Sequence, residues 1–138
     1  MSFANRTAQA MLNSLFGNTS NFGALASAPT IHVALSTTAP AEDGTNVTEP
    51  SGNGYARSAT APADWNAATL ADPSLVDNAN PVAFPQATAS WGACTHFALY
   101  DALTGGNFLG FGVVGTPKTP AANDTPSFPA GSLQVTLD

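Results

Sequence analysis

The sequence predicts an all-β protein: an antiparallel β-sandwich, jelly-roll or immunoglobulin-like, preceded by a short N-terminal α-helix. About seven short runs alternate apolar and polar residues, which is the period of a strand with one buried face. Loops rich in glycine, proline, asparagine and serine separate these runs, as they do in sandwiches and barrels. A length of 138 residues suits one domain. We expect a helical arm over residues 1–17 and a single β-sandwich domain over residues 18–138.

Residues 2–16 are the helix candidate, with Ser2 placed as N-cap and Gly17 where a helix ends. The apolar stripe of this helix packs either on the edge of its own domain, which is the more ordinary arrangement, or on a neighbouring subunit as a docking arm. As a docking arm, its deletion (residues 1–17) should leave a folded domain that no longer docks. The candidate partner contacts are then Phe3, Met11, Leu12, Leu15 and Phe16.

Residues 30–36 form the first predicted strand, in which one face is buried. The apolar positions alternate: Ile31, Val33 and Leu35.

Residues 37–54 are predicted to form a long surface loop, and loops of this length are often functional. The loop carries three acids, Glu42, Asp43 and Glu49. A strand-like register follows it, and Arg57 of that stretch is available to pair with one of the acids.

Residues 61–80 lose all periodicity, so we expect an irregular excursion that Trp65 pins to the core. Residues 82–84 form a short strand that Pro85 ends. The chain closes with a final alternating strand, marked by Phe128, Leu133, Val135 and Leu137.

A β-hairpin is predicted at the centre of the sheet. Its strands are residues 95–100 and 108–114, and the segment between them is rich in the aspartate, glycine and asparagine that turns need. Phe97 and Leu99 share one face of the first strand, and we place Phe97 and Trp91 in the core. In the second strand large side chains face one way and glycines the other. A flat glycine face lets a neighbouring sheet or chain approach closely.

The composition argues against nucleic-acid and membrane partners. The chain has 3 lysines and arginines against 9 acids, so it cannot neutralise a phosphate backbone. No apolar run approaches the roughly 18 residues that a bilayer requires. A charged fraction of 9% with 43% hydrophobic residues fits a protein that is packed in an assembly.

The sequence holds no convincing site for a nucleotide or a zinc ion. Gly110, Gly112 and Gly115 match G-x-G-x-x-G, but this pattern binds dinucleotides only where it opens a helix, and here it lies in a predicted strand. Cys94 and His96 are spaced to project to one face of a strand, yet a zinc site needs at least three protein ligands. We therefore expect no cofactor and no zinc.

Calcium binding and catalysis are also poorly supported. The acids of the 37–54 loop follow no recognised ligand spacing, so a solvated acidic loop is the better interpretation, although an ion between residues 42 and 54 stays open. No nucleophile motif occurs, and neither histidine has an acid beside it in the sequence. We expect no catalytic residues and no enzymatic activity.

Several segments together resemble a family of small virion structural proteins of tailed bacteriophages. They cover most of the chain from residue 31 onwards, and their order matches as well. The segments are VALSTTAP (33–40), EDGTNVTEPSGNGYAR (42–57), FPQATASWG (84–92), THFALYD (95–101), TGGNFL (104–109) and DTPSFPAGSLQVTLD (124–138).

The resemblance implies a non-enzymatic virion protein and brings no catalytic residues with it. Similar proteins are named phage tail fibre proteins, and small β-sandwich proteins of this size also serve as trimeric cement or decoration proteins on phage capsids. Low charge, the early helix and the compact length favour a capsid cement protein that clamps neighbouring coat subunits. The alternative is a tail or tail-fibre component that attaches to the host surface through the acidic loop.

The partners that the resemblance implies are copies of the chain itself, with a homotrimer favoured, and either the major capsid protein or tail proteins. The implied location is the virion, with the capsid surface favoured over the tail.

Overall fold

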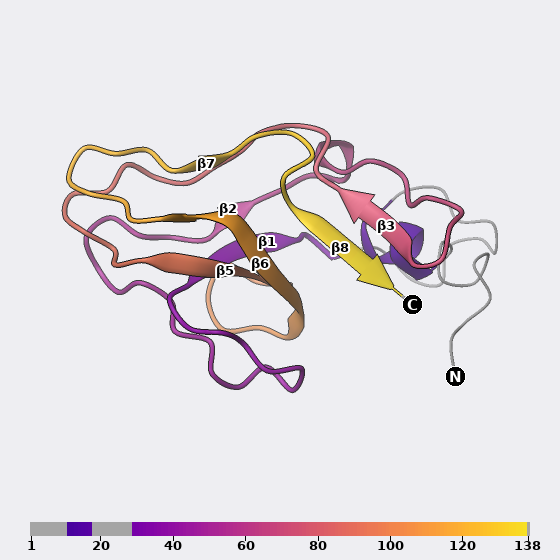
Figure 1. Ribbon diagram of the computed structural model, residues 1–138, viewed down its shortest axis with the longest axis horizontal. Coiled ribbons are helices and arrows are strands. Elements are labelled where there is room, and N and C mark those ends of the chain that lie inside the picture. The colour runs from indigo at the N-terminus through magenta and orange to yellow at the C-terminus, as the bar shows by residue number, and fades with distance from the viewer. Residues whose placement is uncertain (1–10, 18–28, 138) are drawn as a thin grey trace.

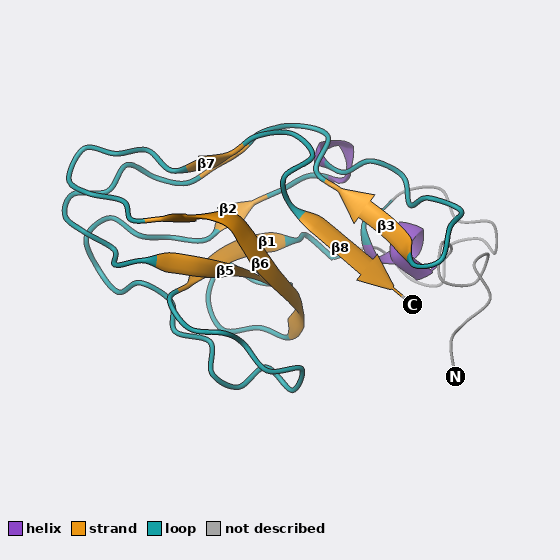
Figure 2. Cartoon of the chain, in the orientation of Figure 1, coloured by secondary structure: helices purple, strands orange, loops and turns teal. Residues whose placement is uncertain are grey.

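The computed structural model describes residues 11–17 and 29–137, and in them the strands pair only in antiparallel sheets (Figures 1 and 2). The all-β prediction is therefore confirmed. The main sheet has the strand order β2-β1-β5-β6. Its strands are β1 (His32–Ser36), β2 (Ser58–Ala59), β5 (Cys94–Tyr100) and β6 (Phe108–Lys118).

Two smaller sheets accompany the main sheet, and each has two strands. They pair β3 (Ser74–Asp77) with β8 (Gln134–Leu137), and β4 (Val82–Ala83) with β7 (Ser127–Phe128). A 3₁₀ turn, η1 (Pro62–Asp64), precedes β3. No helix in the described part of the chain is both long enough and apolar enough to span a bilayer.

The predicted β-hairpin is confirmed, but its glycine face is filled differently from the expectation. β5 pairs with β6 so that Phe97 lies opposite Gly112 and Leu99 opposite Gly110. A Cβ atom on Gly112 would lie 2.5 Å from the Phe97 ring. The ring from the paired strand therefore occupies the space above Gly112, and the expectation that a neighbouring sheet or chain approaches there is wrong at this position.

β1 lies inside the main sheet and is buried on both faces, not on one as predicted. Val33 and Leu35 belong to the main core, whereas Ala34 packs on the opposite face with Ala98. Val47 packs against this second cluster. The loop after β1 thus covers a face that the sequence pattern left exposed, because two alanines leave room for it.

The main core joins the large sheet to the small ones. Trp65, Trp91 and Phe97 are buried as predicted, with exposed fractions of 3%, 5% and 1%. The strands of the smaller sheets contribute the buried residues Val76, Val82 and Phe128.

The segment 61–80 contains the main error in the predicted elements, because it includes the strand β3. In β3 the buried positions are Ser74 and Val76, which alternate with half-buried neighbours. Because β3 has four residues and one of its two inward-facing residues is a serine, the sequence there shows almost no alternation of apolar and polar residues. The irregular excursion is therefore interrupted by β3 at residues 74–77.

The predicted N-terminal helix appears, within the described residues, as one turn over residues 11–15. Gly17 has φ of 76°, the left-handed conformation that ends helices. Leu12 and Phe16 belong to the main core, and the Phe16 ring centroid lies 4.5 Å from that of Trp65. These contacts tie the turn to the β-domain, while the division of the chain at residue 17 stays a prediction.

Candidate functional site

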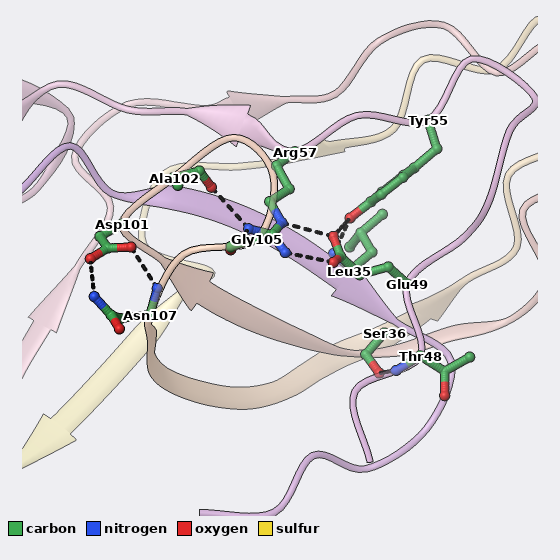
Figure 3. A network of polar contacts seen from close by, with 10 residues as sticks. All are labelled: Leu35, Ser36, Thr48, Glu49, Tyr55, Arg57, Asp101, Ala102, Gly105 and Asn107. Carbon is green, nitrogen blue, oxygen red and sulfur yellow. Dashed lines mark hydrogen bonds and ion pairs between the residues drawn. The ribbon is translucent and has the colours of Figure 1, made fainter. Parts of the chain in front are cut away.

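A buried polar network centres on Arg57 and Glu49 (Figure 3). Arg57 donates from Nε to Glu49 Oε1 at 3.0 Å and from Nη2 to Oε2 at 2.8 Å. Two parallel bonds of this kind are the strong form of an arginine–carboxylate pair. The Arg57 residue is 9% exposed. The prediction that Arg57 pairs with an acid of the long loop is confirmed.

The other side of the guanidinium holds the turn of the β5–β6 hairpin. Arg57 Nη1 donates to the carbonyl oxygens of Ala102 at 2.9 Å and Gly105 at 2.8 Å (Figure 3). The guanidinium carbon also lies 3.7 Å from the centroid of the Tyr100 ring, where a cation is attracted to the aromatic face. One arginine therefore joins the loop after β1, the stretch before β2 and the hairpin turn. We call this set of contacts the Arg57 clamp.

Tyr55 extends the Arg57 clamp to β1. Its hydroxyl donates to Glu49 Oε1 at 2.7 Å and accepts from the Leu35 amide at 3.1 Å. Burial, followed by the hydrogen bond to Glu49, raises the pKa of Tyr55, so the hydroxyl keeps its proton. Burial alone raises the pKa of Glu49, but hydrogen bonds from Arg57 and Tyr55 outweigh burial and lower that pKa below its ordinary value.

A second carboxylate closes the same hairpin turn. Asp101 accepts hydrogen bonds from the Asn107 amide at 2.7 Å and from Asn107 Nδ2 at 2.8 Å, and these bonds lower the pKa of Asp101. Gly106 has φ of 76°, and a Cβ atom there would lie 2.5 Å from Asp101 Oδ1. Glycine is therefore required at this position. Leu103 lies in the turn that the Arg57 and Asp101 contacts hold, and it is 53% exposed.

A groove of about 300 Å³ lies beside the Arg57 clamp, between residues 49–57 and 103–105. The polar groups of Glu49, Tyr55 and Arg57 are engaged with one another and with backbone groups. No buried side-chain nitrogen or oxygen of the described residues lacks a partner. The arrangement therefore holds loops in place and presents no free nucleophile or base.

The zinc candidates do not come together. Cys94 lies in the main core, where burial raises the pKa of its thiol. His96 is half-buried and its Nδ1 lies 2.8 Å from Thr95 Oγ1. A register shift between Cys94 and His96 interrupts the strand alternation, so the expectation that both project to one face is wrong. Across residues 11–17 and 29–137, no three His, Cys, Asp or Glu residues are grouped to hold a metal.

The acids of residues 42–54 do not gather around one point. Asp43 accepts hydrogen bonds from the amide and hydroxyl of Thr45, at 2.9 and 2.7 Å, and Glu49 belongs to the Arg57 clamp. A Cβ atom on Gly44 would lie 3.0 Å from Phe108, so this part of the loop packs on the start of β6. The loop is structured by its own acids.

Three loops that are distant in sequence meet at one end of the molecule, on the left of Figure 1. They are residues 51–54, 86–92 and 120–124, and we call them the three-loop end. Trp91 links them, because its indole donates to the Asn53 carbonyl at 2.8 Å and its amide donates to a carbonyl of the third loop at 3.1 Å. The exposed residues here are small and mostly uncharged. Sequence reasoning missed this surface, since no local pattern shows which loops meet.

The five predicted partner contacts have different surroundings in the structure. Phe3 lies outside the described residues. Leu12 and Phe16 are buried in the main core, Leu15 packs against it partly buried, and Met11 is 38% exposed. Contact of these residues with a partner stays a prediction.

The comparison with known proteins gives one informative result. The family model described as "Podophage GP4 fiber I protein gp80" matches residues 2–136. A search of curated proteins returned no significant match. The family match takes in every strand but the last residue of β8, together with the Arg57 clamp and the three-loop end.

Proposed function

Because this chain belongs to the podophage GP4 fiber I protein family, whose members are phage virion structural proteins, we propose that it is a tail-fibre component. The family match over residues 2–136 is the observation that carries this proposal. The capsid cement interpretation rested on low charge, the early helix and compact length, and the match lends it no support. The tail-fibre alternative fits the match better.

The proposed role is structural and non-enzymatic. The polar groups of Glu49, Tyr55 and Arg57 are engaged with one another in the Arg57 clamp, which is a scaffold contact. Loops held in one arrangement by a rigid scaffold are suited to recognition. We assign contact with the host surface to the three-loop end, because two of the three acids of the long loop, Asp43 and Glu49, are engaged within the chain.

The fold that we propose for this fibre module is a sandwich. The support is that one core cluster is shared by the main sheet and by strands of both smaller sheets, through Val33, Phe97, Val76, Val82 and Phe128. Jelly-roll and immunoglobulin-like connections both remain compatible with it.

Immunogold electron microscopy of intact virions tests the tail-fibre assignment. Antibodies raised against the purified chain should label the tail region. Label distributed over the capsid shell would overturn the assignment.

Host contact is tested separately with viruses that carry single substitutions. Ala89→Arg places a long, charged side chain on the surface of the three-loop end. If this surface contacts the host, the substitution should reduce adsorption to host cells. Ala63→Arg, at an exposed position of η1, is the matched control and should leave adsorption unchanged. Equal adsorption of both variants would remove the three-loop end as the contact surface.

A further inference from the structure

The outer edge of β6 is the long unprotected edge of the main sheet. β6 has eleven residues and is the last strand in the order β2-β1-β5-β6. Among residues 11–17 and 29–137 it pairs with β5 alone. The opposite edge strand, β2, has two residues, and Ser58 Oγ donates to the Ala83 carbonyl at 2.8 Å. One edge is short and covered, whereas the other offers unpaired backbone groups over a long stretch.

The middle of the β6 edge, residues 110–113, lacks the charges, prolines and bulges that protect edge strands from pairing. Natural edge strands carry charges, prolines or strong bulges. Residues 108–116 contain no charged residue and no proline, and β6 pairs regularly with β5 over residues 110–113, between register shifts on either side. Val113 is 69% exposed, and Phe111 of the same sheet face is half-buried. Pro117 and Lys118 come only at the end of the strand. An aliphatic and an aromatic side chain thus lie beside free backbone groups.

Space for a further strand exists along the first half of this edge. A groove of about 430 Å³ is lined by residues 108–112 on one side and by Gln134, Val135 and Thr136 of β8 on the other, and Glu42 also lines it. A Cβ atom on Gly110 would meet no atom within 4 Å, which shows that the glycine opens onto free space. An extended backbone is the kind of group that such an edge binds.

We propose that the occupant is β6 of a second copy of this chain, paired antiparallel about a two-fold axis at Gly112. In that register Phe111 of one copy lies opposite Val113 of the other, and the reverse pair forms by symmetry. Both side chains are on the outer face of the sheet, so each covers the apolar surface of its counterpart. The pairing does not depend on where in the virion the chain is located.

The charge distribution selects a second copy over a charged partner. The chain has a formal net charge of -6, and its copies repel one another wherever their acids come close. Residues 108–116 are a stretch without any charge, so two such edges pair without placing like charges opposite each other. Glu42 is the one acid among the residues that line the groove, and it lies outside the paired strand.

Light scattering after size-exclusion chromatography, over a series of protein concentrations, tests the pairing on the purified full chain. The wild type should approach twice the 13.9 kDa mass of one chain as the concentration rises. Val113→Lys places a charge on the exposed edge and should return the mass to that of one chain at every concentration. Leu103→Lys, on the exposed hairpin turn, is the matched control and should behave as the wild type.

A mixing experiment tests the register. Phe111→Cys and Val113→Cys proteins should be cross-linked by a short thiol-specific reagent when mixed, and far less when each is treated alone. The natural Cys94 is buried and contributes little background. A wild type that stays at one-chain mass, a three-chain mass, or a Val113→Lys protein that associates like the wild type would each overturn the proposal.

Discussion

Arg57 holds together three segments that are far apart in the sequence. Its guanidinium donates four hydrogen bonds, two to Glu49 and one each to the carbonyls of Ala102 and Gly105. The ion pair was predictable, because Arg57 is one of three strong bases and follows an acidic loop. The carbonyl contacts were not, because backbone acceptors leave no signature in a sequence.

Removal of the Arg57 side chain should unfold the protein more easily. Arg57→Ala removes the donor to two carbonyls and leaves the Glu49 carboxylate with the Tyr55 hydroxyl alone, and we expect a loss of about 3 kcal/mol of unfolding free energy. The loss stays below the upper range for a fully buried pair because the Glu49 side chain is 25% exposed. Urea unfolding measures it.

The matched control for Arg57 is the other described base that contacts an aromatic ring. Lys118 lies 5.3 Å from the Phe128 ring centroid and has no ion-pair partner among the described residues. Lys118→Ala should cost less than about 1 kcal/mol. Equal losses for the two variants would contradict the Arg57 clamp.

At the scale of elements, the β5–β6 hairpin was recognisable from sequence, whereas β3 and the packing of its neighbours were not. The hairpin has long alternating runs and a turn rich in glycine, which are local signals. β3 is four residues long, and its inner face begins with Ser74. Its position depends on pairing with β8, nearly sixty residues further along the chain.

Two glycines of β6 should differ in how much stability the same substitution costs. Gly112→Ala forces a methyl group to within 2.5 Å of the Phe97 ring, and such overpacking costs about 1 to 3 kcal/mol. Gly110→Ala meets open space and should change the stability by less than about 0.5 kcal/mol. Thermal unfolding compares the two. If Gly112→Ala melts like the wild type, Phe97 does not fill the space above this glycine.

The helical turn over residues 11–15 should contribute to the stability of the β-domain. Phe16→Ala removes a ring that is 1% exposed and packed on Trp65, which costs about 3 to 5 kcal/mol. Met11→Ala, at a 38% exposed position, is the control and should cost about 1 kcal/mol or less. If the Phe16→Ala protein has wild-type stability, packing of the helical turn on the core does not contribute to the stability of the β-domain.

Because residues 11–17 pack on the main core, deletion of residues 1–17 affects the stability of the domain as well as any docking. The deletion was expected to leave a folded domain that no longer docks. It also removes Leu12 and Phe16 from the main core, together with Asn13 Oδ1, which accepts from the Ala68 amide at 2.6 Å. We therefore expect the truncated chain to be destabilised. Loss of docking on deletion would not by itself identify an arm.

At the scale of the whole molecule, the sequence led to the class of protein but not to its surfaces. The resemblance to phage virion proteins is confirmed by the family match over residues 2–136. Low charge, the early helix and compact length were the grounds for preferring the capsid, and all three are equally compatible with a fibre module packed in an assembly. The three-loop end and the β6 edge depend on long-range pairing, which composition does not reveal.

The number of copies of this chain in purified virions tests the tail-fibre assignment most directly. Quantitative mass spectrometry against the major coat protein gives this number. A tail-fibre component should be present in a few copies per particle, far below the coat protein. A ratio near one copy per coat subunit would contradict the assignment and restore the capsid cement interpretation.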